Sequence, residues 1–217
     1  MLITSCTVVQ GLMAAEEDGQ LPPLPEGVTL PPGRDKIFDP AELDQYWATN
    51  LDFSLLGGPD PELIKTFELM STNPNWNLNL VAFSNGPRKY VLRALKEMGL
   101  DSFFTPDKVF AVTDVLPNCK PDKASFEFVL KSIGANFEEC VMVEDSMKNV
   151  RAAKALGMQT ILVAGKGSLQ ASSAEEKAKR AEATGTEDVP DETDPAVDGV
   201  VEVASEIGDV LTKWLGP

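Results

Sequence analysis

The sequence contains no histidine among its 217 residues. This absence excludes catalytic triads and dyads built on histidine, and it excludes zinc sites with histidine ligands. Any acid–base chemistry in this chain must therefore rely on carboxylates, lysine or tyrosine.

Cysteine and long apolar runs are also scarce. The three cysteines, Cys6, Cys119 and Cys140, follow no disulfide or metal-binding pattern. We interpret them as reduced thiols and expect an intracellular protein, located in the cytoplasm. No apolar run is long enough to cross a membrane, and the mildly apolar residues 1–13 lack the preceding basic region of a signal peptide. We therefore expect no membrane attachment.

Positive charge is in deficit, with 19 basic against 34 acidic residues and a formal net charge of −15. Such a chain repels phosphate backbones, so we expect no nucleic-acid partner. A small anionic substrate is still compatible with this charge, because a site is set by its local charge. The length and the 43% hydrophobic content suit one α/β domain with an insertion, or a large single domain.

Residues 1–75 are expected to be helical with a proline-rich insertion. Residues 21–40 hold too many prolines for a regular element. Asp39-Pro40 and Asp60-Pro61 are helix start signals, because each places a capping acid before a proline at the first helical position.

From residue 76 to residue 166, apolar strands and amphipathic helices alternate. Near-continuously apolar strands of this kind predict a parallel sheet covered by helices on both faces. Residues 167–198 are acidic and poor in large apolar side chains, so we expect a solvated insertion, helical at 174–183 and disordered after it. Residues 199–217 then supply a last strand and a closing helix. The expected strands are 78–83, 109–112, 140–143, 160–164 and 200–203, and the expected core helices are 88–98, 125–133 and 148–156.

Ligands of an open parallel sheet bind beyond the carboxyl ends of its strands. Ser84-Asn85-Gly86 follows the first of these strands, and its backbone N–H groups and hydroxyl suit a phosphate, helped by the dipole of the next helix. The alternative is an ordinary turn in which Ser84 or Asn85 caps that helix. Lys120 precedes the next helix and can face a phosphate or a carboxylate, or it can be a solvated loop lysine.

Glu144 and Asp145 follow a third apolar strand, with Ser146 and Asn149 close behind. Two carboxylates at the end of a buried strand need a cation or hydrogen bonds to compensate them. Oxygen ligands of this kind, with waters and a phosphate, are what Mg²⁺ prefers. The alternative is that Asp145 or Ser146 caps the next helix while Glu144 faces solvent.

Taken together and in this order, the three signals resemble those of the haloacid dehalogenase superfamily over residues 76–165. The pyrimidine 5′-nucleotidase branch is the most similar, on segments that include Cys119-Lys120-Pro121, the Val-Glu-Asp-Ser run, 149–157, 55–63 and 7–12. The resemblance implies a three-layer Rossmann-like sheet with residues 1–75 as a small helical cap region. It also implies Mg²⁺-dependent hydrolysis of a small phosphomonoester, with a nucleoside 5′-monophosphate as one candidate, through an aspartyl-phosphate.

The resemblance also assigns roles to individual residues. Ser84, Asn85 and Gly86 would bind the phosphate, and Lys120 would neutralise the charge that develops on it. Glu144 and Asp145 would hold Mg²⁺, supported by Ser146 and Asn149.

The family's first motif, Asp-x-Asp-x-Thr, does not occur in this sequence. Near Ile37-Phe38-Asp39-Pro40, Ala41 stands where the second aspartate would be. The strand that ends in this motif is central in the family, so the sheet is expected to be interrupted, unless Met1-Leu2-Ile3-Thr4 supplies a short substitute. Two interpretations stay open. The chain is a truncated form of a full-length enzyme, or it is an inactive relative that binds a phosphorylated ligand or a protein partner.

Overall fold

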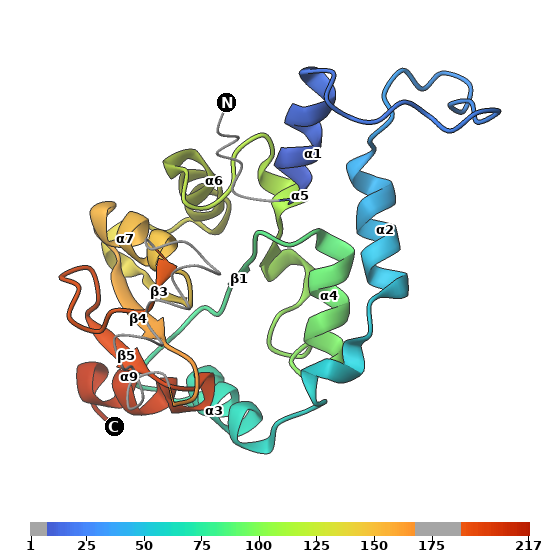
Figure 1. Ribbon diagram of the computed structural model, residues 1–217. Coiled ribbons are helices and arrows are strands. Elements are labelled where there is room, and N and C mark those ends of the chain that lie inside the picture. The colour runs from blue at the N-terminus through green and yellow to red at the C-terminus, as the bar shows by residue number, and fades with distance from the viewer. Residues whose placement is uncertain (1–7, 168–187) are drawn as a thin grey trace.

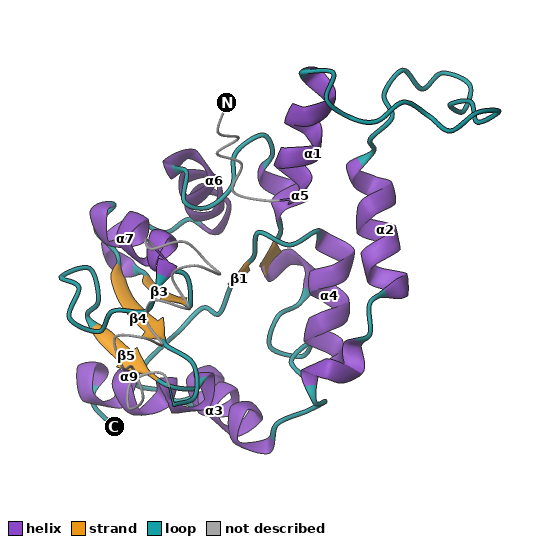
Figure 2. Cartoon of the chain, in the orientation of Figure 1, coloured by secondary structure: helices purple, strands orange, loops and turns teal. Residues whose placement is uncertain are grey.

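The computed structural model describes residues 8–167 and 188–217. Three helices occupy the first third of the chain: α1 (Val8–Glu17), α2 (Pro40–Asn50) and α3 (Pro61–Thr72). Strands and helices then alternate, as the sequence predicts, up to the closing helix α9 (Ile207–Leu215) (Figure 1). Figure 2 shows the strands gathered in the body of the molecule, while α1 and α2 lie at one end of it.

The described strands form two parallel sheets. In the first, β1 (Ala82–Phe83) pairs with β2 (Val109–Phe110). In the second, β3 (Val141–Glu144), β4 (Gln159–Val163) and β5 (Gly199–Val201) pair in the order β3-β4-β5. The α/β fold with parallel strands expected from the sequence is confirmed.

Helices cover both faces of the larger sheet. Leu162 of β4 packs against α7 (Met147–Ala155) through Met147 and Val150. Its neighbour Ile161 belongs to the cluster that α3 and α9 form on the opposite face. Successive strand residues point to opposite faces, so these two fully buried side chains mark the three layers of the fold.

The smaller sheet is covered in the same way. Val109 of β2 packs with Val91 and Leu95 of α4 (Arg88–Glu97). Phe110, the next residue, packs with Val129 of α6 (Lys123–Ile133) on the other face. Both sheets therefore have a helix layer on each side.

The two sheets are separate, and β1 and β3 are their facing edge strands among the described residues. The apolar side chains of β3 are only half-buried, whereas Ile161 and Leu162 of β4 are fully buried. This interruption falls where the family resemblance predicts it. Residues 1–4, the suggested substitute strand, lie outside the described part of the chain.

Two expected strands are shorter than the sequence suggests. The strand expected at 78–83 pairs only at Ala82 and Phe83, and the strand expected at 109–112 pairs only at Val109 and Phe110. The short helix α5 (Val112–Val115) then begins. Among the described strands, β1 and β2 pair only with each other, so their length is limited to the two residues over which they pair.

The helix starts at residues 40 and 61 are confirmed. Asp39 caps α2 by accepting a hydrogen bond from Ala41 N, and Asp60 caps α3 by accepting from Glu62 N and Leu63 N. Between α1 and α2, residues 18–39 contain no helix or strand. The proposed domain boundaries stay predictions.

The described residues 188–198 differ from the expected solvated and disordered segment. Asp194 pairs with Arg151 of α7, and Asp198 accepts a hydrogen bond from Thr160 N and pairs with Lys154. Ala196 is buried in the core. Aspartates can thus anchor a segment to the core through ion pairs and backbone hydrogen bonds, which composition alone does not reveal. The helix expected at 174–183 lies outside the described residues.

In the described ranges, no helix has the length and apolarity that a membrane crossing needs. The expectation that all three cysteines are reduced is wrong for Cys119, which is disulfide-bonded, whereas Cys140 is a free thiol.

Candidate active site

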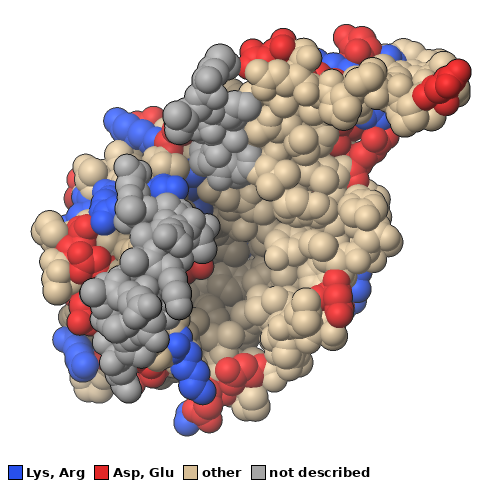
Figure 3. Space-filling model, viewed as in Figure 1, with Lys and Arg blue, Asp and Glu red and all other residues tan. Residues whose placement is uncertain are grey.

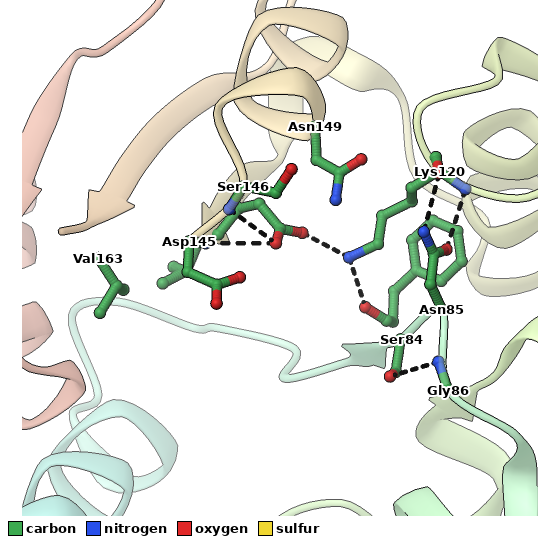
Figure 4. Close-up of a pocket in the computed structure, with 11 residues that line it drawn as sticks. Ser84, Asn85, Gly86, Lys120, Asp145, Ser146, Asn149 and Val163 are labelled. Atoms are coloured by element: carbon green, nitrogen blue, oxygen red, sulfur yellow. Dashed lines mark hydrogen bonds and ion pairs between the residues drawn. The ribbon is translucent and has the colours of Figure 1, made fainter. Parts of the chain in front are cut away.

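A cavity of about 660 Å³ opens where β1 and β3 end. All eight residues that the sequence singled out line this cavity, together with Phe83, Val143 and Val163 (Figure 4). They come from the ends of two separate sheets and from the loop before α6. Figure 3 shows the molecule hollowed between its two parts on this side. The eight predicted residues are Ser84, Asn85, Gly86, Lys120, Glu144, Asp145, Ser146 and Asn149.

Lys120 joins the two strand ends. Its Nζ lies 2.5 Å from Glu144 Oε2 and donates a hydrogen bond of 2.9 Å to the carbonyl oxygen of Phe83. Only 5% of Lys120 is exposed, so the alternative of a solvated loop lysine is wrong. A buried ammonium needs such partners, because its desolvation is otherwise uncompensated.

Asn85 holds the backbone of Lys120 in place. Its Oδ1 accepts from Lys120 N at 3.1 Å, and its Nδ2 donates to Lys120 O at 2.8 Å. This two-way contact joins the loop after β1 to the loop before α6. It also uses polar atoms of Asn85 that the sequence assigned to phosphate binding.

Hydrogen bonds hold the loop after β1 in a tight conformation. Ser84 N donates to Phe110 O, and Gly86 N donates to Ser84 Oγ at 3.0 Å. A Cβ at Gly86 would lie 3.1 Å from Tyr90 Cδ1 and 3.3 Å from Ser84 Oγ. A side chain at this position would therefore crowd the loop, which explains the glycine.

The amino end of α4 is already occupied by a carboxylate. Asp44 of α2 is buried and accepts from Lys89 N at 2.8 Å and Tyr90 N at 3.2 Å. These two N–H groups are therefore already paired with a side chain of the protein. The alternative that Ser84 or Asn85 caps α4 is wrong, because Pro87 takes the N-cap position.

The two adjacent carboxyl groups differ in their surroundings. Glu144 is buried, and its Oε1 accepts from Asp145 N and Ser146 N. Burial acts to raise the pKa of Glu144, but the Lys120 ammonium and these hydrogen bonds outweigh it and hold the pKa below its ordinary value. Hydrogen bonding to Glu144, burial and the charge of Glu144 raise the pKa of Asp145 to about 6. Glu144 does not face solvent, contrary to the alternative from sequence.

Ser146 directly precedes α7, and Asn149 lies in the first turn of this helix. Ser146 takes the N-cap position, but its side chain makes no capping hydrogen bond. Asp188, which the sequence gave no reason to select, accepts from Lys148 N at that helix end instead. Asn149 is buried and lines the cavity.

The donors around Asp145 suit a hard divalent cation. Glu144 and Asp145 offer carboxylate oxygens, Ser146 a hydroxyl and Asn149 an amide oxygen. The Lys120 ammonium pairs with Glu144 and, among the described residues, leaves the charge of Asp145 without a paired cation, which agrees with the raised pKa of Asp145. Within residues 8–167 and 188–217, acidic and cysteine side chains form no group of three that could hold a metal. Waters and a phosphate would therefore have to complete the coordination of Mg²⁺, as is usual for this ion.

The sequence profile of haloacid dehalogenase-like hydrolases matches residues 33–157, more than half of the chain. The chain therefore belongs to the haloacid dehalogenase-like hydrolase family. This confirms the superfamily resemblance that the sequence motifs carry.

Two curated proteins are similar in sequence to part of this chain. Phosphoglycolate phosphatase 1 of Pseudomonas aeruginosa is 32% identical over 99 residues, which are 46% of this chain and 34% of that protein. Pyrophosphatase PpaX of Halalkalibacterium halodurans is 31% identical over 97 residues, 45% of this chain and 44% of that protein. The matched stretch thus spans about a third of the first relative and under half of the second.

Among solved structures, the L-2-haloacid dehalogenase of Xanthobacter autotrophicus has the same fold. It superposes with a TM-score of 0.53 over 71% of this chain and 61% of its own, at 20% sequence identity. Such low identity supports the fold alone.

Proposed function

We propose that this chain forms the phosphate- and metal-binding part of a Mg²⁺-dependent phosphomonoester hydrolase that acts on a small phosphorylated molecule. One observation carries the proposal. The Lys120 ammonium sits between the ends of β1 and β3, in a cavity lined by Ser84-Asn85-Gly86 from one sheet and by Glu144-Asp145 from the other.

Each residue has a distinct task in this proposal. The Ser84 hydroxyl and the Asn85 N–H receive the phosphate, because the N–H groups of Ser84 and Gly86 already donate to Phe110 O and Ser84 Oγ. Lys120 places a positive charge where negative charge develops during transfer. Glu144 fixes Lys120, and with Asp145 it offers the carboxylate oxygens for Mg²⁺. When bound there, Mg²⁺ would neutralise phosphate charge and orient the phosphoryl group.

The family's route through an aspartyl-phosphate needs an aspartate nucleophile. The sequence has no Asp-x-Asp-x-Thr, and Glu144 and Asp145 are the only carboxylates that line the cavity among the described residues. We therefore expect no turnover by this chain alone, and activity only where an aspartate nucleophile is supplied.

Two separate indications suggest candidate substrates. The relatives named above include a phosphoglycolate phosphatase and a pyrophosphatase. The motifs around Lys120 and Glu144 resemble the pyrimidine 5′-nucleotidase branch, which favours a nucleoside 5′-monophosphate. A panel of 2-phosphoglycolate, pyrophosphate and nucleoside 5′-monophosphates therefore covers the candidates.

A second candidate function is that of a non-catalytic protein that binds a phosphorylated ligand, and the absent nucleophile pattern favours it. Calorimetric titration with the panel in Mg²⁺ measures binding, and phosphate release measures hydrolysis. We expect heat of binding without release from this chain. Binding of none of the ligands would contradict both functions.

The role of the missing nucleophile has its own test. Phosphate release from p-nitrophenyl phosphate is measured with Mg²⁺, for the native chain and for Asp145→Ala. Turnover by the native chain that disappears in Asp145→Ala would show that the site works without the first motif. No turnover in either protein is the expected result.

A further inference from the structure

Asp188 caps the amino end of α7 from a distant part of the chain. Its Oδ1 accepts a hydrogen bond from Ser146 Oγ at 2.7 Å and another from Lys148 N at 3.1 Å. Its Oδ2 lies 3.6 Å from Lys148 Nζ. Ser146 lines the candidate site, so a residue outside the cavity directly contacts one that lines it.

The contact fixes how the Ser146 hydroxyl can act. A hydroxyl has one hydrogen to donate and two lone pairs to accept with. The Ser146 hydrogen is committed to Asp188, so only lone pairs remain for the cavity. Lone pairs suit a cation or a water held by a cation, whereas a phosphate oxygen would need the hydrogen.

A continuous set of contacts leads from Asp188 to the ammonium of Lys120. Ser146 N donates to Glu144 Oε1, and Glu144 Oε2 pairs with Lys120 Nζ. Figure 4 shows both of these contacts as dashed lines. Asp188 holds Ser146 in place, and the backbone N–H of Ser146 in turn stabilises the Glu144 carboxylate.

We propose that Asp188 is a positioning residue of the candidate site: it turns Ser146 into an acceptor toward the cavity and holds the turn that carries Glu144 and Asp145. This inference rests on the proposed function, because cation binding at these carboxylates is itself a proposal. It also gives Asp188, a described residue of the acidic segment 167–198, a task at the site.

Asp194 offers a matched control. It belongs to the same segment and also anchors that segment to α7, through Arg151 Nε at 2.8 Å. Neither Asp194 nor Arg151 lines the cavity. Asp194→Ala therefore removes an anchor of the same kind without touching Ser146.

Calorimetric titration of the full chain with Mg²⁺ compares Asp188→Ala, Asp188→Asn and Asp194→Ala with the native protein. Loss of an outer partner of a metal site typically weakens metal binding about tenfold or more. We expect a loss of about tenfold in Asp188→Ala. Asp188→Asn should recover most of the affinity, because its amide oxygen still accepts both hydrogen bonds, and Asp194→Ala should bind as the native chain does. Equal losses in Asp188→Ala and Asp194→Ala, or no loss in Asp188→Ala, would overturn the proposal.

Amide NMR spectra of the metal-free proteins keep the two proposals separable. We expect the amide resonances of Glu144 and Asp145 to shift in Asp188→Ala but not in Asp194→Ala, and the Lys148 amide to exchange faster with solvent. If the native chain binds no Mg²⁺, the proposed function fails, and the spectra alone decide the role of Asp188. Unmoved resonances at Glu144 and Asp145 in Asp188→Ala would then refute it.

Discussion

Lys120 Nζ and Glu144 Oε2 lie 2.5 Å apart in a buried ion pair that joins the loop before α6 to the end of β3. The same ammonium reaches the carbonyl oxygen of Phe83 at the end of β1. The described parallel strands form two separate sheets, and this lysine connects the two strand ends that face each other.

Removing either partner of this pair should destabilise the fold strongly. Lys120→Met leaves the Glu144 carboxylate buried without its counter-ion, which typically costs about 3–5 kcal/mol. Urea unfolding of Lys120→Met should show a loss of this size, and the double variant Lys120→Met/Glu144→Gln should recover part of it. A surface pair such as Lys123–Glu127 is the control, because exposed pairs contribute about 1 kcal/mol or less. Equal losses for both pairs would contradict the burial argument.

The pH dependence of stability should report Asp145. Its pKa is raised from an ordinary 3.8 to about 6, so the folded state holds this proton to higher pH than the unfolded state does. The resulting stability is fully present below pH 3.8 and is lost as the pH rises through about 6. In metal-free buffer, Asp145→Asn should therefore be more stable than the native chain above pH 6, by on the order of 1–2 kcal/mol after solvent screening.

The check is thermal unfolding of both proteins between pH 4 and pH 8, with a chelator present. The difference between them should grow with pH and level off above pH 6. A difference that stays constant over this range would show that Asp145 titrates normally.

Asp44 should stabilise the contact between α2 and α4. Asp44→Ala leaves Lys89 N and Tyr90 N without their acceptor, and loss of a helix cap costs about 0.5–2 kcal/mol. Hydrogen exchange at these two amides should accelerate in Asp44→Ala, whereas Asp44→Asn, which keeps an acceptor oxygen, should protect them. Unchanged exchange in Asp44→Ala would contradict this assignment.

Two glycines should respond to alanine in opposite directions. A Cβ at Gly199 of β5 would lie 2.8 Å from Val210 Cγ1 and 3.0 Å from Trp214, so Gly199→Ala forces α9 away from the sheet. Overpacking of this kind costs about 1–3 kcal/mol. A Cβ at Gly208 meets nothing closer than 3.5 Å, so Gly208→Ala should stabilise α9 by up to about 1 kcal/mol. Chemical unfolding of both variants measures the two effects, and a loss in each would refute the contrast.

The site is predictable from the sequence because several of its residues lie at strand ends. Ser84 directly follows β1 and Glu144 ends β3, and parallel strands bring such positions to one edge, whereas Lys120 lies beyond β2 and α5 in the loop before α6. The same logic cannot find Asp44 or Asp188, whose partners lie 45 and 40 positions away in the chain. In an acidic sequence, neither aspartate differs from its neighbours in any local pattern.

The order of strands and helices was also predictable from the sequence, but not the length of every strand. The alternating apolar runs gave the parallel strands and their helices, and Asp39-Pro40 and Asp60-Pro61 gave two helix starts. The lengths of β1 and β2 were not predictable, because a ladder depends on which strands become neighbours. The packing of Ala196 likewise depends on tertiary contacts that an acidic, small-residue composition conceals.

Binding of inorganic phosphate, followed by calorimetry with and without Mg²⁺, tests the central claim most directly. The native chain should bind phosphate more tightly when Mg²⁺ is present. Asp145→Asn should lose this Mg²⁺ dependence, and Ser84→Ala should weaken phosphate binding under both conditions. Phosphate binding that is indifferent to Mg²⁺ and to both substitutions would contradict the assignment of this cavity as a phosphate and metal site.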